Sequence, residues 1–167
     1  MRILHDNGAG GLAIVIPAPN YVAAVMKANP LMTEADVVAY IAQKDVPANV
    51  AHEIVEDIDV PTDRTFRDAW EHDTTDAPEK IRTNMVKAKP IAHEMRRAKR
   101  AEDFAPLDQE VMLVAGVEAA GAVAPKAMKD KAAAAETARQ AIRDADAVKQ
   151  TAIDAAATEA ELKALVV

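Results

Sequence analysis

Histidines and adjacent carboxylates are the side chains of this sequence that are best able to bind a metal ion or to transfer a proton. The zinc-protease motif His-Glu-x-x-His begins at His93-Glu94, but Arg97 stands where the motif requires its second histidine. A single imidazole on a helix cannot define a zinc site, and the other histidines (His5, His52 and His72) lie far apart in the sequence. We therefore expect no metal site.

Nucleophilic catalysis lacks its usual residues, because the 167-residue sequence contains neither Cys nor Ser. Acid pairs such as Glu56-Asp57 and Asp144 with Asp146 are typical of solvated surfaces, where nothing tunes them for proton transfer. The Gly8–Gly11 cluster lacks the following helix and the Lys of a phosphate-binding loop, so it is interpreted as a turn. The sequence predicts a protein that is not an enzyme and that uses no cofactor.

Charge and composition divide the chain into three segments. Residues 1–78 carry 5 basic and 13 acidic side chains, residues 79–104 carry 8 and 4, and residues 105–167 carry 7 and 10. The chain contains 38 Ala and only five aromatic residues, so it buries little apolar area per residue. We predict a small α/β head, a basic connecting helix and an Ala-rich helical tail, and the thin core suggests help from a partner or from self-association.

The head is predicted to have the order β-β-α-β, which with the helical tail gives the α+β class. A hairpin is expected from Arg2–His5 and Leu12–Ile16, joined by the glycine-rich turn. Thr33 with Asp36 resembles a capping box and predicts a helix that ends near Pro47. Residues 51–56 are interpreted as a strand. A further short helix at 21–27 and a further strand at 80–82 are additional alternatives.

An aromatic block occupies residues 60–70. A short helix after Pro61 would place Phe66 and Trp70 one above the other, at i and i+4. One interpretation makes this pair part of the head's core, and the other makes it an anchor for a partner protein. The scarcity of aromatic residues favours the core.

The basic helix is predicted from Asn84 to about Phe104, with a kink or a new start at Pro90. On it, four cations form a compact positive patch: Arg96, Arg97, Lys99 and Arg100. The net charge of −7 and the absence of interleaved aromatics argue against nucleic acid as the partner. The patch is either a solvated face or a contact for an acidic protein surface, in another subunit or in the acidic head.

The tail is predicted to form a helical hairpin or bundle. A helix over Leu107–Val117 is expected to be broken by Gly116 and Gly121 with Pro125, and a second helix is expected from Lys126 to about Ala157. The large apolar residues of this second helix do not repeat as heptads, which argues against a conventional coiled coil. Thr158 and Glu161 form a capping box that predicts a short last helix. No apolar run approaches the roughly 18 residues of a membrane span, and no signal peptide opens the chain, so no membrane partner is expected.

Five segments of the chain carry a family resemblance. They are the hairpin ending Ile14-Val15-Ile16-Pro17-Ala18-Pro19, the block 61–70 (PTDRTFRDAW), the helix from Met85 to Arg97, residues 138–144 and residues 158–165. In this order they resemble a family of small proteins encoded by tailed bacteriophages and prophages among tail and tail-fibre genes. The resemblance implies a role in tail structure or assembly and supplies no catalytic residues.

Together these observations predict a non-enzymatic virion structural protein of the tail tip or tail-fibre attachment region. It would be located in the virion tail and, during assembly, in the host cytoplasm. Its expected partners are other tail, baseplate or fibre proteins and further copies of itself, with a trimer favoured. The alternatives are a tail or tail-fibre assembly chaperone that is absent from the mature particle, and a capsid decoration protein.

Overall fold

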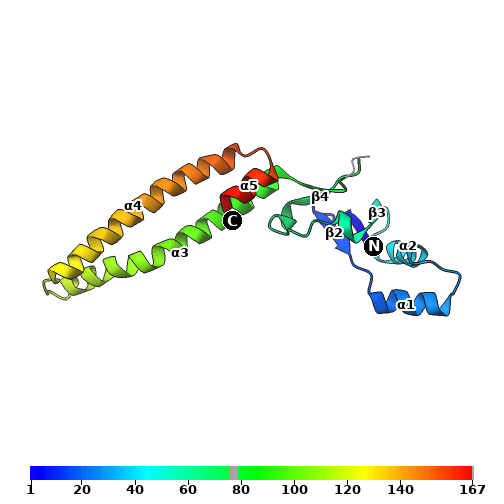
Figure 1. Cartoon of the computed structure of the whole chain (residues 1–167), viewed down its shortest axis with the longest axis horizontal. Helices are drawn as coiled ribbons and strands as arrows, with labels where there is room; N and C mark the ends of the chain where they lie inside the picture. Colours follow the sequence, from blue (N-terminus) through cyan, green and yellow to red (C-terminus); the bar gives the residue numbers. More distant parts are fainter. Residues whose placement is uncertain (76–78, 167) are drawn as a thin grey trace. The chain divides into compact units, whose positions relative to one another are not determined.

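The computed structural model describes residues 1–75 and 79–166, in which two small antiparallel sheets precede three helices of the C-terminal half (Figure 1). The predicted α+β class is confirmed. The chain forms two compact units, which we call unit 1 (Met1–Ala88) and unit 2 (Lys89–Val167). The boundary predicted at residue 78 lies outside the described residues.

The first sheet of unit 1 has the strand order β2-β1-β3. β1 (Arg2–Asp6) and β2 (Leu12–Val15) form the predicted antiparallel hairpin, and β3 (His52–Val55) pairs with the other edge of β1. In the connecting turn, Gly8 and Gly10 adopt φ angles of 78° and 74°, which other residues rarely adopt. The sequence therefore predicted both the hairpin and the reason for its glycines.

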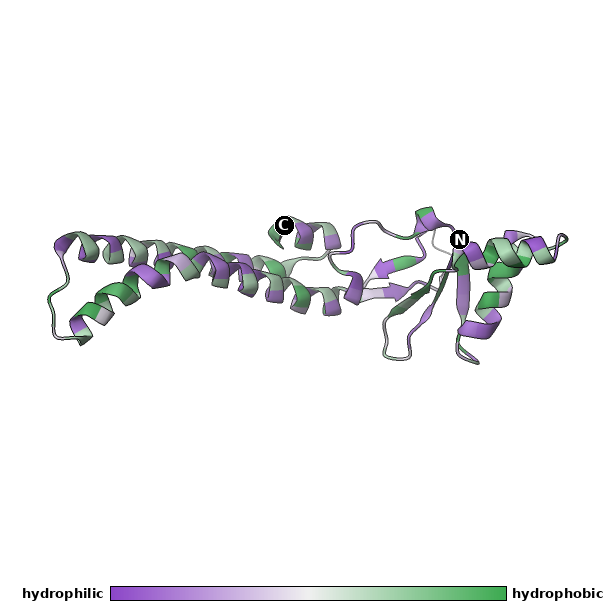
Figure 2. Cartoon of the chain, turned by 90° about the horizontal axis from the view of Figure 1, so that it is seen from below, coloured by the Kyte–Doolittle hydropathy of each residue, from purple (hydrophilic) through white to green (hydrophobic). Residues whose placement is uncertain are grey.

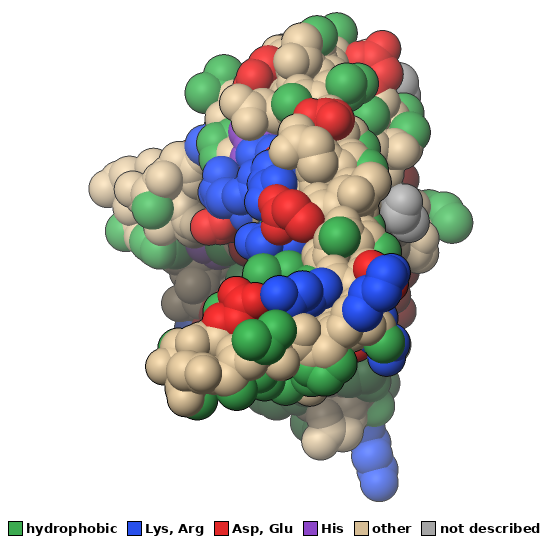
Figure 3. Space-filling view, turned by 90° about the vertical axis from the view of Figure 1, so that its left-hand side faces the viewer, with side chains coloured by type: hydrophobic (Ala, Val, Ile, Leu, Met, Phe, Trp, Pro, Cys, Tyr) green, Lys and Arg blue, Asp and Glu red, His purple; other side chains and the backbone are tan. Residues whose placement is uncertain are grey.

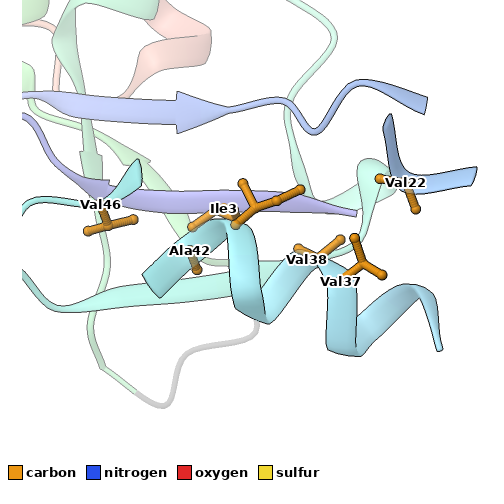
Figure 4. Close-up of a cluster of buried hydrophobic side chains, with 7 residues drawn as sticks. Ile3, Val22, Val37, Val38, Ala42 and Val46 are labelled. Carbon is orange, nitrogen blue, oxygen red and sulfur yellow. The ribbon is translucent and has the colours of Figure 1, made fainter. Parts of the chain in front are cut away.

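Two helices cover this sheet: α1 (Pro19–Ala28) and α2 (Glu34–Asp45). The predicted capping box begins α2, since Thr33 N donates to Asp36 Oδ2 at 2.8 Å and Asp36 N donates to Thr33 Oγ1 at 3.2 Å. Apolar side chains of both helices, and that of Val46 directly after α2, pack against Ile3 of β1 (Figure 4). They are Val22, Val37, Val38, Ile41, Ala42 and Val46.

The aromatic block does not form the predicted helix. Single turns of 3-10 helix, η1 (Asp57–Asp59) and η2 (Arg67–Ala69), precede β4 (Trp70–His72), which pairs with β5 (Ile81–Thr83). Trp70 therefore begins a strand opposite Thr83 instead of stacking on Phe66 one helical turn away. The prediction was wrong because pairing and burial of Trp70 against distant parts of the chain override the local helical spacing.

Helix α3 (Met85–Ala119) runs through both Pro90 and Pro106, so the predicted end near Phe104 was wrong. Each proline removes one amide donor from the helix at a cost of roughly 3 kcal/mol. Ion pairs to the next helix lie on both sides of Pro106, from Arg100 and from Asp108.

The rest of unit 2 is formed by α4 (Lys126–Ala155) and α5 (Glu159–Val166). α3 and α4 run side by side as an antiparallel hairpin, and hydrophobic and hydrophilic residues alternate along both helices (Figures 1 and 2). α5 begins with the predicted capping box, in which Thr158 N donates to Glu161 Oε2 at 3.2 Å. Its Leu162 is fully buried.

Candidate partner-binding surface

The aromatic pair lies inside unit 1. Phe66 has no exposed surface and Trp70 retains 2% of its surface exposed. Trp70 packs with Leu4, Val55 and Ile81, and the guanidinium carbon of Arg64 lies 5.8 Å from the centre of its ring. This burial is what the core interpretation requires, so the pair is not part of the partner-binding surface.

A charged network ties the start of α3 to the hairpin turn within unit 1. Lys87 Nζ donates to Glu71 Oε1 at 2.6 Å and also to the carbonyl oxygen of Gly10. Asn84 Nδ2 donates to the same oxygen of Glu71 at 2.7 Å. These hydrogen bonds, that from Lys87 first, lower the pKa of Glu71 below its ordinary value. The network therefore stabilises the charged carboxylate and has a structural role.

The basic patch predicted on α3 is only partly a surface. The guanidinium of Arg96 forms an ion pair with Asp146 of α4, and the two side chains retain only 7% and 9% exposure. Arg100 Nη1 donates to the same oxygen, Oδ2 of Asp146, at 2.8 Å. Two arginines of α3 therefore share one carboxylate of α4.

The remaining two cations of the patch pair within α3. Arg97 contacts Glu94 at 2.9 Å, and Lys99 contacts Asp103 at 3.0 Å. The hydrogen bond to Asp103 is the main reason why the pKa of Lys99 is raised. Arg96, Lys99 and Arg100 line one cavity, whereas Arg97 is not among its lining residues. The carboxylates that meet these cations belong to α3 and α4, which the sequence analysis did not consider as partners.

A second charged cluster surrounds Phe104. The guanidinium carbons of Arg139 and Arg143 each lie 5.7 Å from the centre of its ring, a distance typical of cation–π contacts. Both arginines also contact Glu136, at 2.6 and 3.0 Å, and the hydrogen bond from Arg143 is the main cause of the lowered pKa of that carboxyl. This cluster gives the hairpin a second set of contacts between α3 and α4.

The spacing of the covered residues on α4 explains both clusters. Positions that are at least half-buried recur at steps of four and three residues, as on a coiled-coil helix. From Met128 to Asp146 they are Met128, Ala132, Ala135, Arg139, Ile142 and Asp146, with Ala138 and Arg143 covered beside them, and Ala152 and Ile153 are covered near the end of the helix. The sequence analysis missed this pattern because it counted only large apolar residues. Inclusion of Ala and of charges would have identified Arg139 and Asp146.

Toward the α3–α4 connection, unit 2 leaves apolar side chains uncovered. Leu107, Val111 and Val114 are half-buried, whereas Met112 and Leu113 expose 71% and 48% of their surfaces. Figure 3 faces this end of the hairpin and shows hydrophobic side chains at the surface between charged ones. A two-helix hairpin has no further layer to cover them.

Neither a metal site nor a membrane span is found among the described residues. Within residues 1–75 and 79–166, no three His, Asp or Glu side chains are grouped so that they could hold a metal ion. None of the helices in this part of the chain is both long enough and apolar enough to cross a lipid bilayer.

Comparisons with protein-family models, with curated proteins and with solved structures found no match to this chain. The candidate surface therefore rests on the contacts and the burial of its own residues.

Proposed function

We propose that this chain is a non-enzymatic structural protein of a tailed-bacteriophage particle, placed at the tail tip or tail-fibre attachment. It acts by packing against copies of itself, with a trimer favoured, and by docking onto other tail, baseplate or fibre proteins. The phage context comes from the resemblance of five segments of the sequence to small proteins encoded among tail genes.

The observation that carries the packing role is the incomplete core of unit 2. Apart from Ile153 and Leu162, the buried hydrophobic residues described in this unit are all Ala. Ala contributes little to burial, while Met112 and Leu113 remain in solvent. Apolar side chains left at the surface of a thin hairpin favour association with another protein, which would bury them.

Mass spectrometry of purified particles from the phage or prophage that encodes the chain tests the location. Its presence in stoichiometric amounts supports the virion role. Its presence in infected cells but not in particles would support the alternative of an assembly chaperone. Recovery with empty heads rather than with tails would support a capsid decoration protein.

Sedimentation equilibrium of the isolated chain tests the packing role. We expect a mass of at least twice the 17.8 kDa of one chain. A folded monomer at all accessible concentrations would contradict self-association and leave only docking to other proteins.

A further inference from the structure

Unit 2 contains a cavity of about 150 Å³ that is lined by α3, α4 and α5. Its charged lining residues are Arg96, Lys99, Arg100, Asp103, Asp146 and Lys149. This volume is below the roughly 300–1,000 Å³ of most small-molecule sites, so the cavity suits a single functional group.

The charges around this cavity do not balance. Four lining side chains are positive and two are negative. Asp103 pairs with Lys99, and Asp146 is shared by Arg96 and Arg100. Lys149 has no ion-pair partner among residues 1–75 and 79–166. The lining itself therefore carries a surplus of two positive charges, which Glu102, in contact with Lys99 at 3.6 Å from outside the lining, reduces to one.

One of the positive side chains, Arg96, is also incompletely matched in the protein interior. The side chain of Arg96 is more than nine-tenths buried, and its Nε atom is buried without a hydrogen-bond partner. A buried guanidinium is costly unless its charge and its donors are both matched. One carboxylate between two arginines fills only part of this requirement, so positive charge remains for a second carboxylate on the exposed side of the pair, beside Arg100.

The cavity also has an apolar wall, formed by Met95, Ile142 and Leu165 among others. Such a wall accommodates methylene groups and gives no advantage to a phosphate. The lining contains no aromatic ring on which a nucleic-acid base could stack.

We propose that this cavity binds the carboxylate of a glutamate side chain, presented by an acidic segment of a partner protein. Arg100 and Lys149 at the rim hold the carboxylate, and the apolar wall holds its aliphatic stem. The inference rests on the docking part of the proposed function, but its test uses the isolated chain. A failure to bind peptide would therefore be distinct from absence of the chain in particles.

The test measures fluorescence anisotropy of a labelled hexaglutamate peptide titrated with the full chain at low salt. We expect saturable binding, and no binding of hexaglutamine. Lys149→Gln and Arg100→Gln should each weaken binding about tenfold, as expected for loss of one charged hydrogen bond. Lys131→Gln is the matched control, because Lys131 is an exposed lysine of the same helix outside the cavity.

Methionine-methyl NMR locates the peptide. The methyl signal of Met95, in the cavity wall, should shift on binding, while that of the exposed Met112 should not. Equal weakening by Lys131→Gln, or an unmoved Met95 signal, would overturn the proposal by showing general attraction between opposite charges. Displacement of the peptide by equimolar inorganic phosphate would also overturn it, since the site would then be a generic anion site.

Discussion

Arg96 and Asp146 lie 50 residues apart in the sequence and form an ion pair whose side chains are both more than nine-tenths buried. Buried pairs of this kind add little net stability relative to apolar residues of the same size, but loss of one partner is costly. This pair therefore acts as a register contact between α3 and α4, because a shift of either helix would leave a charge buried alone.

The first prediction concerns Asp146→Asn. The variant leaves Arg96 buried without a counter-charge, so we expect unit 2 to lose about 3–5 kcal/mol of unfolding free energy. Thermal and urea unfolding followed by circular dichroism measure the loss. The double variant Arg96→Met with Asp146→Leu should recover most of it. A melting curve of Asp146→Asn equal to that of the wild type would contradict the structural role of the pair.

The second prediction concerns charge reversals in the basic patch, which contains the buried Arg96 and the exposed Arg97. If the basic patch were a solvated face, as one interpretation of the sequence has it, Arg96 could be reversed to Glu without harm to the fold. In the structure, such a glutamate would face Asp146 in a buried position, so the reversal destabilises unit 2. Arg97→Glu, on the exposed side of α3, should leave the melting temperature nearly unchanged. A circular-dichroism melt of each single variant tests this contrast.

Trp70→Ala is expected to destabilise unit 1 by about 3–5 kcal/mol, because it removes a large side chain of which only 2% is exposed. Urea unfolding followed by circular dichroism avoids dependence on the single Trp as a probe. Tyr40→Ala is the control, since half of Tyr40 is exposed and its truncation should cost much less. Equal effects of the two variants would place Trp70 outside the core.

Unit 1 should lose stability in acid partly through Glu71. Its pKa in the folded state is lowered from the ordinary 4.5, mainly by the hydrogen bond from Lys87, so folding favours the charged form. This contribution is complete above the unfolded-state pKa and is lost as the pH falls through the lowered folded-state pKa. Glu71→Gln should therefore cost about 1 kcal/mol at pH 7 and much less at a pH below the lowered folded-state pKa. Urea titrations at both pH values measure this, with Glu79→Gln as the control at an exposed carboxyl.

Leu113→Asp tests whether the uncovered end of the hairpin mediates self-association. The side chain is half exposed, so we expect the melting of the monomer to change little and association to weaken by about tenfold or more. Sedimentation velocity over a concentration series measures the change. Leu31→Asp makes the same substitution at a position of unit 1 that is 98% exposed, and it should leave association intact. Equal effects at both positions would show that Leu113 has no special role.

Much of the fold could be predicted from local signals in the sequence. Gly8 and Gly10 require a turn, and the Thr33–Asp36 and Thr158–Glu161 pairs each begin a helix, because these signals act between residues close in the chain. Strand β4 could not be predicted in this way, since Trp70 pairs with Thr83 and is buried by residues distant in sequence.

The candidate site was predicted only in part. The cations of α3 were recognised from their clustering, but their pairing with Asp146 depends on how α3 and α4 align. The ion pairs on both sides of Pro106 depend on the same alignment, because they reach across to α4. Both features follow from long-range geometry that a count of large apolar residues does not capture.

The mixed character of the α3–α4 contact has a thermodynamic consequence. Unfolding of apolar contacts raises the heat capacity of a protein, while exposure of polar groups lowers it. A helix contact made largely of Ala and of the Arg96–Asp146 and Arg139–Asp108 ion pairs, with few large apolar residues, therefore gives a small heat-capacity change on unfolding. The free energy of unfolding of unit 2 should follow a flatter curve with temperature than that of unit 1, so that cooling weakens the hairpin less than it weakens the aliphatic core around Ile3.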